Sequence, residues 1–372
     1  MKKIIFNAMI LDNKPTGLGV YTKNILERIG SKESITKIIC KNKELIKKQI
    51  PAIDEEKLIE ISYGDSKIKS FYRNLFTNNY VNKNFNDKGF LIYSSTQHGV
   101  NNSRVKQIVT VHDVIALFNH KGRYIQYLYY KFIFPIVLKK VDLIITISNS
   151  TKNDLIKFYK IMPEKIKVIY NGFDKPQKID KKYSLNYMKD KYSLENYILM
   201  VGINYEYKNL HTVIEIYSKI FDEVKSPLVI VGNCNNRYGK YLIELVHSLN
   251  LESHIKFLGY VTEEERQYIY QAASMFVYPT LYEGFGLPPL ESMANGTPVI
   301  CSNTSSLPEV VGNAAILFNP NDKQDIEKCI KKMHYMEEKE KLEYIERGYE
   351  NIKKFSWDKT ARDILSVLEN IN

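Results

Sequence analysis

The sequence predicts an α/β protein built from two doubly wound parallel-sheet domains. Its 372 residues are too many for one comfortable hydrophobic core, so we expect two domains of roughly 180 residues each. Short β-branched apolar runs alternate with amphipathic stretches of helical period, and no low-complexity tract or internal repeat interrupts them. Strands that alternate with helices form parallel sheets with helices on both faces.

Residues 1–175 are predicted to form the first domain. Its apolar, β-branched runs are expected to be strands: Lys2–Leu11, Ile35–Cys40, Leu91–Thr96, Val105–Asp113 and Leu143–Ser148. The segment Ile166–Asp174 closes the domain. A helix is predicted within Thr16–Gly30, and Gly17 and Gly19 are expected in the loop that feeds it. Backbone can approach a phosphate or sugar closely at such a loop. The polar stretch Lys41–Lys88 allows no firm assignment.

The predicted strand Val105–Asp113 ends in the pair His112-Asp113. A His at the carboxyl end of a parallel strand points to the edge where open α/β sheets bind ligands. The alternative is a structural histidine, and the residue pattern alone leaves both interpretations open. His98, after the preceding strand, is a weaker candidate.

The stretch Arg123–Lys140 interleaves Tyr, Phe and Ile with Arg and Lys. Such a pattern is typical of an interfacial helix on an acidic bilayer, or of a core helix whose basic ends reach solvent. The second interpretation is favoured.

Residues 176–196 are polar and contain Pro176, so they are predicted to be an interdomain linker. Residues 197–355 alternate regularly between strand and helix and form the second predicted domain. Thr262 and Glu265 have the spacing of a capping box. Residues 356–372 are predicted to be an amphipathic C-terminal helix.

The most informative stretch of the second domain runs from Tyr278 to Ser302. It predicts a strand end, a Gly-Phe-Gly turn, a helix entered through prolines, and another strand. The free N–H groups and positive dipole of such a helix favour an anion. Glu283 on the turn and Glu291, expected in the first helical turn, bracket that position and could accept hydrogen bonds from sugar hydroxyls. Alternatively, Glu291 only complements the helix dipole and Glu283 is a solvated loop acid.

Charge is distributed unevenly along the chain. Residues 1–180 contain 31 Lys and Arg against 16 Asp and Glu, whereas residues 181–372 contain 22 against 26. The basic half predicts an anionic partner: an acidic membrane surface, a phosphorylated acceptor or nucleic acid. The alternative is that these lysines are ordinary solvated surface.

Features that the sequence lacks argue against a metalloprotein, a membrane-spanning protein and a secreted protein. The four cysteines have no paired spacing, which fits reduced thiols and argues against a zinc site. There is no Asp-x-Asp metal motif, and no apolar run approaches the roughly 20 residues of a spanning helix. The N-terminus lacks a small-residue cleavage site. We therefore expect a cytoplasmic protein without a metal or a cofactor.

The segment YEGFGLPPLESMANGTPVI, followed by LPEVV at Leu307–Val311, resembles the donor-site signature of the retaining GT-B glycosyltransferases of glycosyltransferase family 4. The resemblance implies two Rossmann-like domains with a cleft between them. It implies that the N-terminal domain binds the acceptor, that the C-terminal domain binds a nucleotide sugar, and that the final helix packs back on the N-terminal domain.

The resemblance also implies site residues. His112, Glu283 and Lys208 would be catalytic, with Lys208 on the diphosphate and His112 near the reacting sugar carbon. Relatives often carry an Arg where this chain has Ile203 or Tyr207, so one positive charge is missing, and Asn204, Arg237 or backbone N–H groups would have to compensate. The residues implied to bind the donor are Gly17, Gly19, Asn204, Tyr260, Val261, Gly284, Phe285, Gly286, Leu287 and Glu291.

The implied function is transfer of a hexose, with retention, from a nucleoside-diphosphate sugar to a hydroxyl of a glycan or lipid-linked acceptor in bacterial surface polysaccharide synthesis. GDP-mannose is the first expectation for the donor and a UDP-hexose the second. The expected location is cytoplasmic, with peripheral contact to the inner face of the membrane through the basic domain. The alternatives are a nucleotide-sugar epimerase, a noncatalytic sugar-nucleotide sensor and, more distantly, a nucleic-acid-binding or DNA-modifying protein. No nucleic acid partner is expected, because no recognition motif for one is present.

Overall fold

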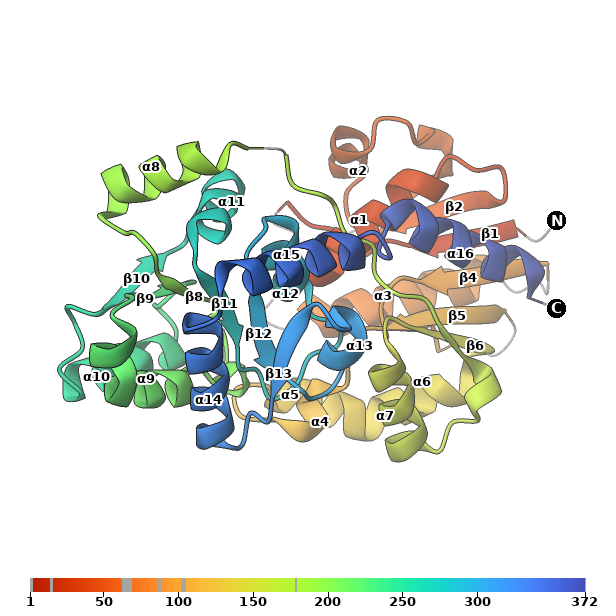
Figure 1. Ribbon diagram of the computed structural model, residues 1–372. Coiled ribbons are helices and arrows are strands. Elements are labelled where there is room, and N and C mark those ends of the chain that lie inside the picture. The colour runs from red at the N-terminus through yellow and green to blue at the C-terminus, as the bar shows by residue number, and fades with distance from the viewer. Residues whose placement is uncertain are drawn as a thin grey trace. The chain divides into compact units, whose positions relative to one another are not determined.

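The structure is a computed structural model that describes residues 3–13, 16–61, 69–85, 89–101, 105–177 and 179–371. The chain divides into two compact units, which are described separately (Figure 1). Unit 1 comprises Met1–Gly172 and Phe355–Asn372, and unit 2 comprises Phe173–Lys354.

Unit 1 is built on a seven-stranded parallel sheet with the order β3-β2-β1-β4-β5-β6-β7. Its strands are β1 (Lys3–Asn7), β2 (Ile35–Cys40), β3 (Leu58–Glu60), β4 (Phe90–Ser94), β5 (Lys106–Val111), β6 (Leu143–Thr146) and β7 (Ile166–Val168). The central strands are nearly continuous runs of buried apolar residues, as expected for a parallel sheet covered on both faces.

The connections of unit 1 are mostly helical. They are α1 (Gly17–Ile29), α2 (Lys43–Gln49), η1 (Glu55–Lys57), α3 (Lys69–Asn84), α4 (Ile115–Phe118), α5 (Tyr124–Leu128), the π-helix η2 (Tyr129–Ile133), α6 (Phe134–Lys140), α7 (Asn149–Tyr159) and η3 (Pro163–Lys165). The polar stretch that the sequence left unassigned therefore contains α2, β3 and α3. Part of that stretch, residues 62–68 and 86–88, lies outside the described residues.

The C-terminal helix α16 (Trp357–Asn370) packs on α1 within unit 1. The indole of Trp357 meets the ring of Tyr21 edge-on at 5.9 Å. At the surface, Arg28 pairs with Asp358 at 2.6 Å. Gly172 passes so close to Trp357 that a Cβ there would lie 2.4 Å from it, so this contact requires glycine.

Unit 2 is built on a six-stranded parallel sheet with the order β10-β9-β8-β11-β12-β13. Its strands are β8 (Ile198–Val201), β9 (Leu228–Val231), β10 (Ile255–Gly259), β11 (Met275–Tyr278), β12 (Val299–Ser302) and β13 (Ala315–Phe318). The two parallel sheets confirm the predicted fold class.

Helices cover both faces of the unit 2 sheet (Figure 1). On one face α9 (Leu210–Val224) packs against α10 (Arg237–Ser248) and α14 (Lys323–His334). On the other face lie α11 (Glu263–Ala272), α12 (Leu287–Ala294) and α15 (Glu338–Ile352). The short elements η4 (Glu206–Lys208) and α13 (Leu307–Val311) complete the unit. The capping box of Thr262 and Glu265 at the start of α11 is confirmed.

The predicted linker at 176–196 needs a correction. It contains the helix α8 (Lys181–Tyr192), which Asp180 caps and which packs on α11 as part of unit 2. Ser184 donates a hydrogen bond to Gln271 at 2.6 Å, and the ring of Tyr187 lies 4.8 Å from that of Tyr268. The helix buries little besides Ser184 and Met188, which is why its sequence looked like a solvated connection.

Candidate active site

The strand order of unit 2 defines where a ligand is expected. The chain builds outward from β8 through β9 to β10, then returns to the other side of β8 and continues through β11, β12 and β13. The direction of winding therefore reverses between β8 and β11. Doubly wound sheets bind ligands at the carboxyl ends of the strands that flank this reversal. Lys208 follows β8 and Glu283 follows β11, so both lie at this place.

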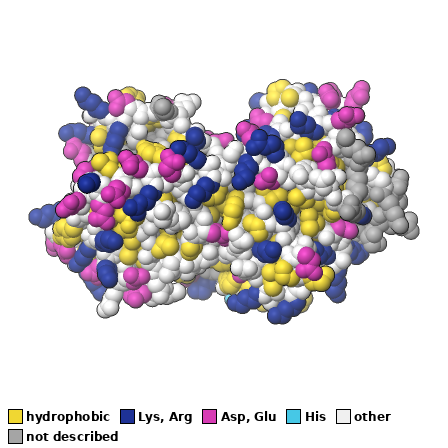
Figure 2. Space-filling model, turned by 45° about the vertical axis from the view of Figure 1, so that its right-hand side comes forward, with side chains coloured by type: hydrophobic (Ala, Val, Ile, Leu, Met, Phe, Trp, Pro, Cys, Tyr) yellow, Lys and Arg dark blue, Asp and Glu magenta, His cyan; other side chains and the backbone are white. Residues whose placement is uncertain are grey.

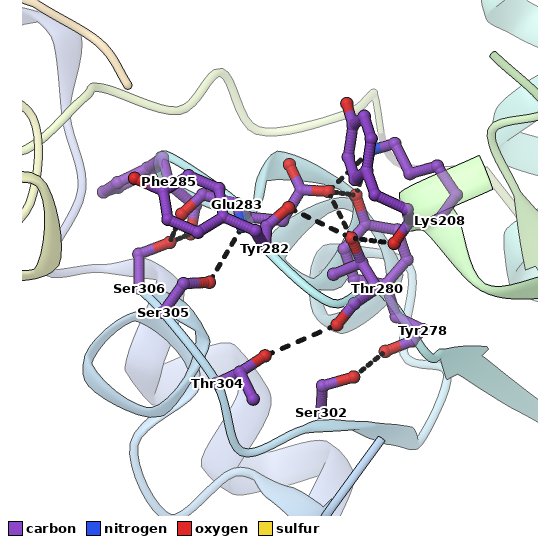
Figure 3. Close-up of polar contacts among 11 residues, drawn as sticks. Lys208, Tyr278, Thr280, Tyr282, Glu283, Phe285, Ser302, Thr304, Ser305 and Ser306 are labelled. Atoms are coloured by element: carbon purple, nitrogen blue, oxygen red, sulfur yellow. Dashed lines mark hydrogen bonds and ion pairs between the residues drawn. The ribbon is translucent and has the colours of Figure 1, made fainter. Parts of the chain in front are cut away.

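Lys208 and Glu283 form an ion pair there (Figure 3). Lys208 Nζ lies 2.6 Å from Glu283 Oε1, and both side chains are largely shielded from solvent, with 13% and 15% exposed. The Tyr278 hydroxyl accepts a hydrogen bond from Lys208 at 2.8 Å and donates one to Glu283 Oε1 at 2.9 Å. Thr280 Oγ1 lies 3.0 Å from the same carboxylate oxygen. We call Lys208, Tyr278, Thr280 and Glu283 the charged cluster.

Tyr278 holds this cluster together because it is the last residue of β11 and is fully buried. Burial, followed by the charge of Glu283, raises the pKa of the Tyr278 phenol well above its ordinary value. The phenol therefore stays protonated and remains a donor to Glu283. Its ring also lies below the ammonium of Lys208, 5.2 Å from centroid to Nζ, and the ring of Tyr207 lies at 5.4 Å. These contacts fix the position of the lysine head group.

Serine side chains fix the turn that carries Glu283 (Figure 3). Ser305 Oγ accepts a hydrogen bond from the Glu283 amide at 2.8 Å. Ser306 Oγ lies 3.0 Å from the Glu283 carbonyl and 2.6 Å from the Phe285 carbonyl. The turn ends at Gly286, whose φ of 111° lies in the region that L side chains rarely adopt, and a Cβ there would lie 2.6 Å from Leu307 Cδ2.

The turn and the start of α12 present amides without protein partners. No hydrogen bond joins the backbone N–H groups of Gly284, Gly286 and Leu287 to any residue that the structure describes. Pro288 and Pro289 follow at the second and third helical positions and have no N–H to offer. An anion at this helix terminus would therefore be held by the amides of the turn together with Lys208.

Glu291 lies further along α12 than predicted. It is the fifth residue of the helix, and no acidic residue occupies the first turn. Glu291 accepts a hydrogen bond from the buried Tyr270 hydroxyl at 3.1 Å, and its other oxygen lies 3.6 Å from the guanidinium of Arg266. Burial raises the pKa of Glu291, and the charge of Arg266 opposes this rise. The carboxylate is thus positioned by α11, and the interpretation of Glu291 as a first-turn dipole partner is wrong.

The two positions at which a second cation was expected are part of the core. Ile203 is fully buried and packs where Gly232 leaves room for it, and Tyr207 is 7% exposed. A charged side chain at either position would have to be buried, which is costly. Arg237, named as a substitute, is exposed at the start of α10. Lys208 is accordingly the cation that the structure places in the charged cluster.

The other predicted donor-binding residues of unit 2 lie on loops at the same edge of the sheet. Asn204 follows β8 and is exposed, and Tyr260, which follows β10, is 89% exposed. Val261 is half-buried, and Phe285 is buried within the turn. An aromatic side chain as exposed as Tyr260 is available to a planar ligand.

His112 lies in unit 1 and is buried. Nε2 donates a hydrogen bond to the Ser95 carbonyl at 2.9 Å, because the carbonyl can only accept. Tyr21 meets the imidazole edge-on at 4.6 Å. Burial lowers the pKa of His112 from 6.5 to about 4, so the ring is neutral at pH 7 and keeps Nδ1 as an acceptor. The ring is thus both structural and placed at the carboxyl end of β5.

Gly17 and Gly19 were predicted to lie in a loop, and this prediction is wrong because both lie in a helix. Gly17 and Gly19 are the first and third residues of α1, and the loop ends before them at Thr16. Gly19 is buried in the helix, whereas a Cβ on Gly17 would meet no atom within 4 Å. Residues 14 and 15, which precede this helix, lie outside the described residues.

Sequence reasoning missed Tyr278, Thr280, Tyr270 and Arg266 as parts of the site. Tyr278 carried a usable signal, because the last residue of a buried strand lies at the ligand-binding edge. Arg266 carried none, since only the packing of α11 on α12 brings it to Glu291. Within the described part of the chain, no group of three or more His, Cys, Asp or Glu side chains is arranged to hold a metal ion.

The fold and the charged cluster together define a class, the two-domain α/β proteins of the GT-B type. A family model for "Glycosyl transferases group 1" matches residues 188–351, and one for "Glycosyltransferase Family 4" matches residues 90–175. The chain therefore contains domains that match two glycosyltransferase families, as the signature around Glu283 and Glu291 predicted.

Two curated relatives resemble this chain in sequence. The O-antigen chain mannosyltransferase RfbU of Salmonella typhimurium is 34% identical over 230 residues, which are 62% of this chain and 61% of the relative. The O-antigen chain mannosyltransferase B of Escherichia coli is 31% identical over 245 residues, again 62% of this chain and 61% of the relative. The matches thus span about three fifths of the length of these relatives.

Solved structures resemble the chain over its whole length. Anabaena Alr3699/HepE, solved in complex with UDP and glucose, superposes with a TM-score of 0.75 at 18% identity and covers 100% of both chains. WaaG, described as a glycosyltransferase involved in lipopolysaccharide biosynthesis, has a TM-score of 0.72 at 12% identity, covering 99% of this chain and 100% of WaaG. At these identities the likeness establishes the fold.

Proposed function

We propose that this protein transfers a hexose, with retention of anomeric configuration, from a nucleoside-diphosphate sugar to a hydroxyl group of a glycan or lipid-linked acceptor. The observation that carries the proposal is the Lys208–Glu283 pair at the reversal of the unit 2 sheet, beside the unbonded amides of the turn before α12. A cation and free N–H groups suit a diphosphate, and carboxylates suit sugar hydroxyls.

Each group of the site has a role in this proposal. Lys208 and the amides of Gly286 and Leu287 bind the diphosphate. Glu291 accepts hydrogen bonds from the ribose hydroxyls, and the exposed Tyr260 ring lies against the base. Glu283 holds hydroxyls of the transferred sugar through Oε2, which forms no hydrogen bond to any described residue, whereas Oε1 already has three partners.

The reaction breaks the bond between the anomeric carbon and the phosphate oxygen and forms a bond between that carbon and the acceptor oxygen. The bonding electron pair leaves with the nucleoside diphosphate, and the acceptor proton passes to the departing phosphate oxygen. Stabilising the charge that develops on the leaving group is the main catalytic demand, and Lys208 with the turn amides meets it. The positive charge of these groups supports a reaction that requires no metal ion.

Retention follows if the acceptor attacks from the face that the diphosphate leaves. The alternative route to retention uses a carboxylate as a covalent nucleophile. Glu283 is poorly suited to that role, because Oε1 is already held by Lys208, Tyr278 and Thr280. The cluster therefore favours same-face attack assisted by the leaving phosphate.

The first choice of donor is GDP-mannose and the second is a UDP-hexose. Support for mannose comes from the two relatives that are named O-antigen chain mannosyltransferases. Their names also support an acceptor in bacterial surface polysaccharide synthesis. A lipid-linked acceptor would require the protein to work at the cytoplasmic face of a membrane, in peripheral contact with it.

A ligand screen by thermal shift tests the proposal. The purified protein would be melted with GDP, UDP, dTDP, CMP and their common sugar conjugates, beside Glu291→Gln and the surface control Glu215→Gln. Gln at 291 can still accept from Tyr270, so the variant changes the charge with little effect on packing. A ligand at a hundred times its Kd should stabilise the protein by about 2.7 kcal/mol.

We expect one nucleotide to raise the melting temperature of wild type and Glu215→Gln, and to do so less for Glu291→Gln. Stabilisation by no nucleotide would contradict the donor site. Turnover assays with radiolabelled donor and a hydroxyl acceptor then separate the alternatives. Free sugar or epimerised donor without a glycoside would indicate an epimerase, and binding without any turnover would indicate a sensor.

A further inference from the structure

The segment from α5 to α6 in unit 1 exposes several large apolar side chains to solvent. Ile125 is 75% exposed, Tyr124 63% and Phe132 57%, and Ile133 and Ile136 are also exposed. We call this set, together with Lys131 and Lys139, the α5–α6 surface. A folded protein normally exposes large apolar side chains singly, so a group of them on one element indicates an interaction site.

The opposite side of the same segment is well packed. Tyr130, Phe134, Val137 and Leu138 are buried in a hydrophobic cluster with β5, β6 and α7. The segment is therefore anchored to unit 1, and the interpretation of this stretch as a core helix is confirmed for that side. One side is a core helix, and the other side has the composition of an interfacial helix.

The backbone explains why the exposed residues share one side. Ile125, Phe132 and Ile136 are separated by seven and four residues, which is the spacing of one helical stripe. The π-helical turn η2 at Tyr129–Ile133 lies between α5 and α6, and its last residue, Ile133, is exposed beside Phe132. Such π-turns occur frequently at functional sites.

Charge on this segment has a single sign. Residues 114–141 contain no Asp or Glu, but they contain five basic residues: Lys121, Arg123, Lys131, Lys139 and Lys140. Lys131 lies across aromatic rings, 5.4 Å from the Tyr127 centroid and 5.5 Å from the Phe132 centroid. Its ammonium also donates a hydrogen bond to the Tyr127 hydroxyl at 3.1 Å, so the charge lies directly beside the apolar side chains. Figure 2 shows one face of the whole molecule, on which hydrophobic side chains lie among both basic and acidic ones.

We infer that the α5–α6 surface docks on the anionic headgroups of a lipid bilayer, with its isoleucine and phenylalanine side chains in the interface. Basic residues beside exposed apolar ones match a negatively charged surface with an apolar interior. Nucleic acid would use the lysines but not the aliphatic side chains. No helix among the described residues is long and apolar enough to cross a membrane.

The position of the surface fits an acceptor held at a bilayer. On the buried side, the Tyr130 hydroxyl donates to the Asp113 carbonyl at 2.9 Å and the Tyr129 hydroxyl to the Gln97 carbonyl at 3.1 Å. These carbonyls belong to the loops that leave β5 and β4, and His112 lies on the first of them. The docking surface is therefore backed by the ligand-binding edge of the unit 1 sheet. The inference rests on the proposed function only in requiring a lipid-linked acceptor.

Cosedimentation with vesicles tests this docking without any donor. The full chain would be spun with phosphatidylcholine vesicles that contain phosphatidylglycerol, and with vesicles of phosphatidylcholine alone. Two variants change the surface: Ile125→Ser/Phe132→Ser/Ile136→Ser and Lys131→Gln/Lys139→Gln. Leu342→Ser/Lys339→Gln is the matched control, because both residues are exposed on α15 in unit 2. Melting curves check that every variant is folded.

We expect wild type and the control to bind the acidic vesicles and to bind the neutral ones much less. Removing two lysines should lower the partition coefficient about 25-fold, at roughly fivefold for each, and the serine variant should lose binding. Equal binding to both kinds of vesicle, or none, would overturn the inference. A dimer in solution that only the serine variant abolishes would assign the surface to a second copy instead. The protein could lose vesicle binding and still turn over the donor. The vesicle experiment therefore tests membrane docking independently of the proposed glycosyl transfer.

Discussion

Lys208 and Glu283 are joined at 2.6 Å, from two loops that leave the neighbouring strands β8 and β11. A nucleotide sugar would therefore bind beside a lysine whose ammonium is already held in place by a carboxylate. The pair orders both side chains before binding, which lowers the entropy that binding would otherwise cost. It also means that removing either partner leaves the other largely buried and unpaired.

Lys208→Ala should lower kcat about 100- to 1000-fold, because the departing diphosphate loses a preorganised positive charge. The matched control is Lys323→Ala, which removes a lysine paired with Glu215 at 2.6 Å on the exposed surface of the same unit. Initial rates at saturating donor would measure the effect. Equal rates for the two variants would show that Lys208 does not act on the leaving group.

Tyr278→Phe should lower the free energy of unfolding by about 1 kcal/mol, because the change deletes the hydroxyl that bridges Lys208 and Glu283. Lys208 still reaches Glu283 directly, so we expect kcat to fall far less than in Lys208→Ala. Urea denaturation and steady-state rates would measure the two quantities. A loss of kcat as large as that of Lys208→Ala would instead make Tyr278 part of the reaction.

Gly286→Ala should destabilise the protein by at least about 1–2 kcal/mol, because the backbone has a positive φ and the new Cβ would collide with Leu307. Gly17→Ala should leave the free energy of unfolding unchanged or slightly higher, since it adds a methyl group in open space to a helix.

If Gly17 approaches the donor as its family resemblance implies, Gly17→Ala should raise KM for the donor without lowering the melting temperature. An unchanged KM would remove Gly17 from the site.

His112 should make stability fall as the pH is lowered. Its pKa is about 4 in the folded protein and near 6.5 in the unfolded chain, so the unfolded state binds more protons between these values. The His112 contribution is complete above about pH 6.5 and should decrease by about 2 kcal/mol between pH 7 and pH 5. Urea denaturation of wild type and His112→Gln at pH 7 and pH 5 would measure the His112 contribution, as the difference between the two proteins in how much free energy of unfolding they lose. Parallel pH profiles would contradict the burial of a neutral imidazole.

Arg266→Ala should weaken nucleotide binding most at mildly acidic pH. Burial raises the pKa of Glu291 and Arg266 opposes that rise, so the variant should protonate Glu291 at a higher pH than wild type does. A protonated Glu291 is a weaker acceptor for ribose hydroxyls. Calorimetric titrations of the stabilising nucleotide at pH 5.5 and pH 8 would measure the effect. The ratio of the two Kd values should be larger for Arg266→Ala than for wild type.

Much of the fold follows from local pattern. The apolar runs at Ile35–Cys40 and Leu143–Ser148 became β2 and β6, because parallel strands buried on both faces need continuous apolar residues. The capping box at Thr262 fixed the start of α11 for a similarly local reason. The prediction was wrong where a helix buries few residues. The helix α8 was predicted to be part of a linker because it buries only two residues, so its sequence lacks an apolar face.

The sequence by itself determined the alternation of strands and helices, the family signature around Glu283 and Glu291, and the presence of Lys208 after a strand. Tertiary structure decided which of these groups meet. Strand order brought Lys208 to Glu283 across 75 residues of chain, and the packing of α11 on α12 brought Arg266 to Glu291. It also turned half of the α5–α6 segment outward. Contacts between residues far apart in the chain depend on how whole elements pack, and no local pattern of residues encodes that packing.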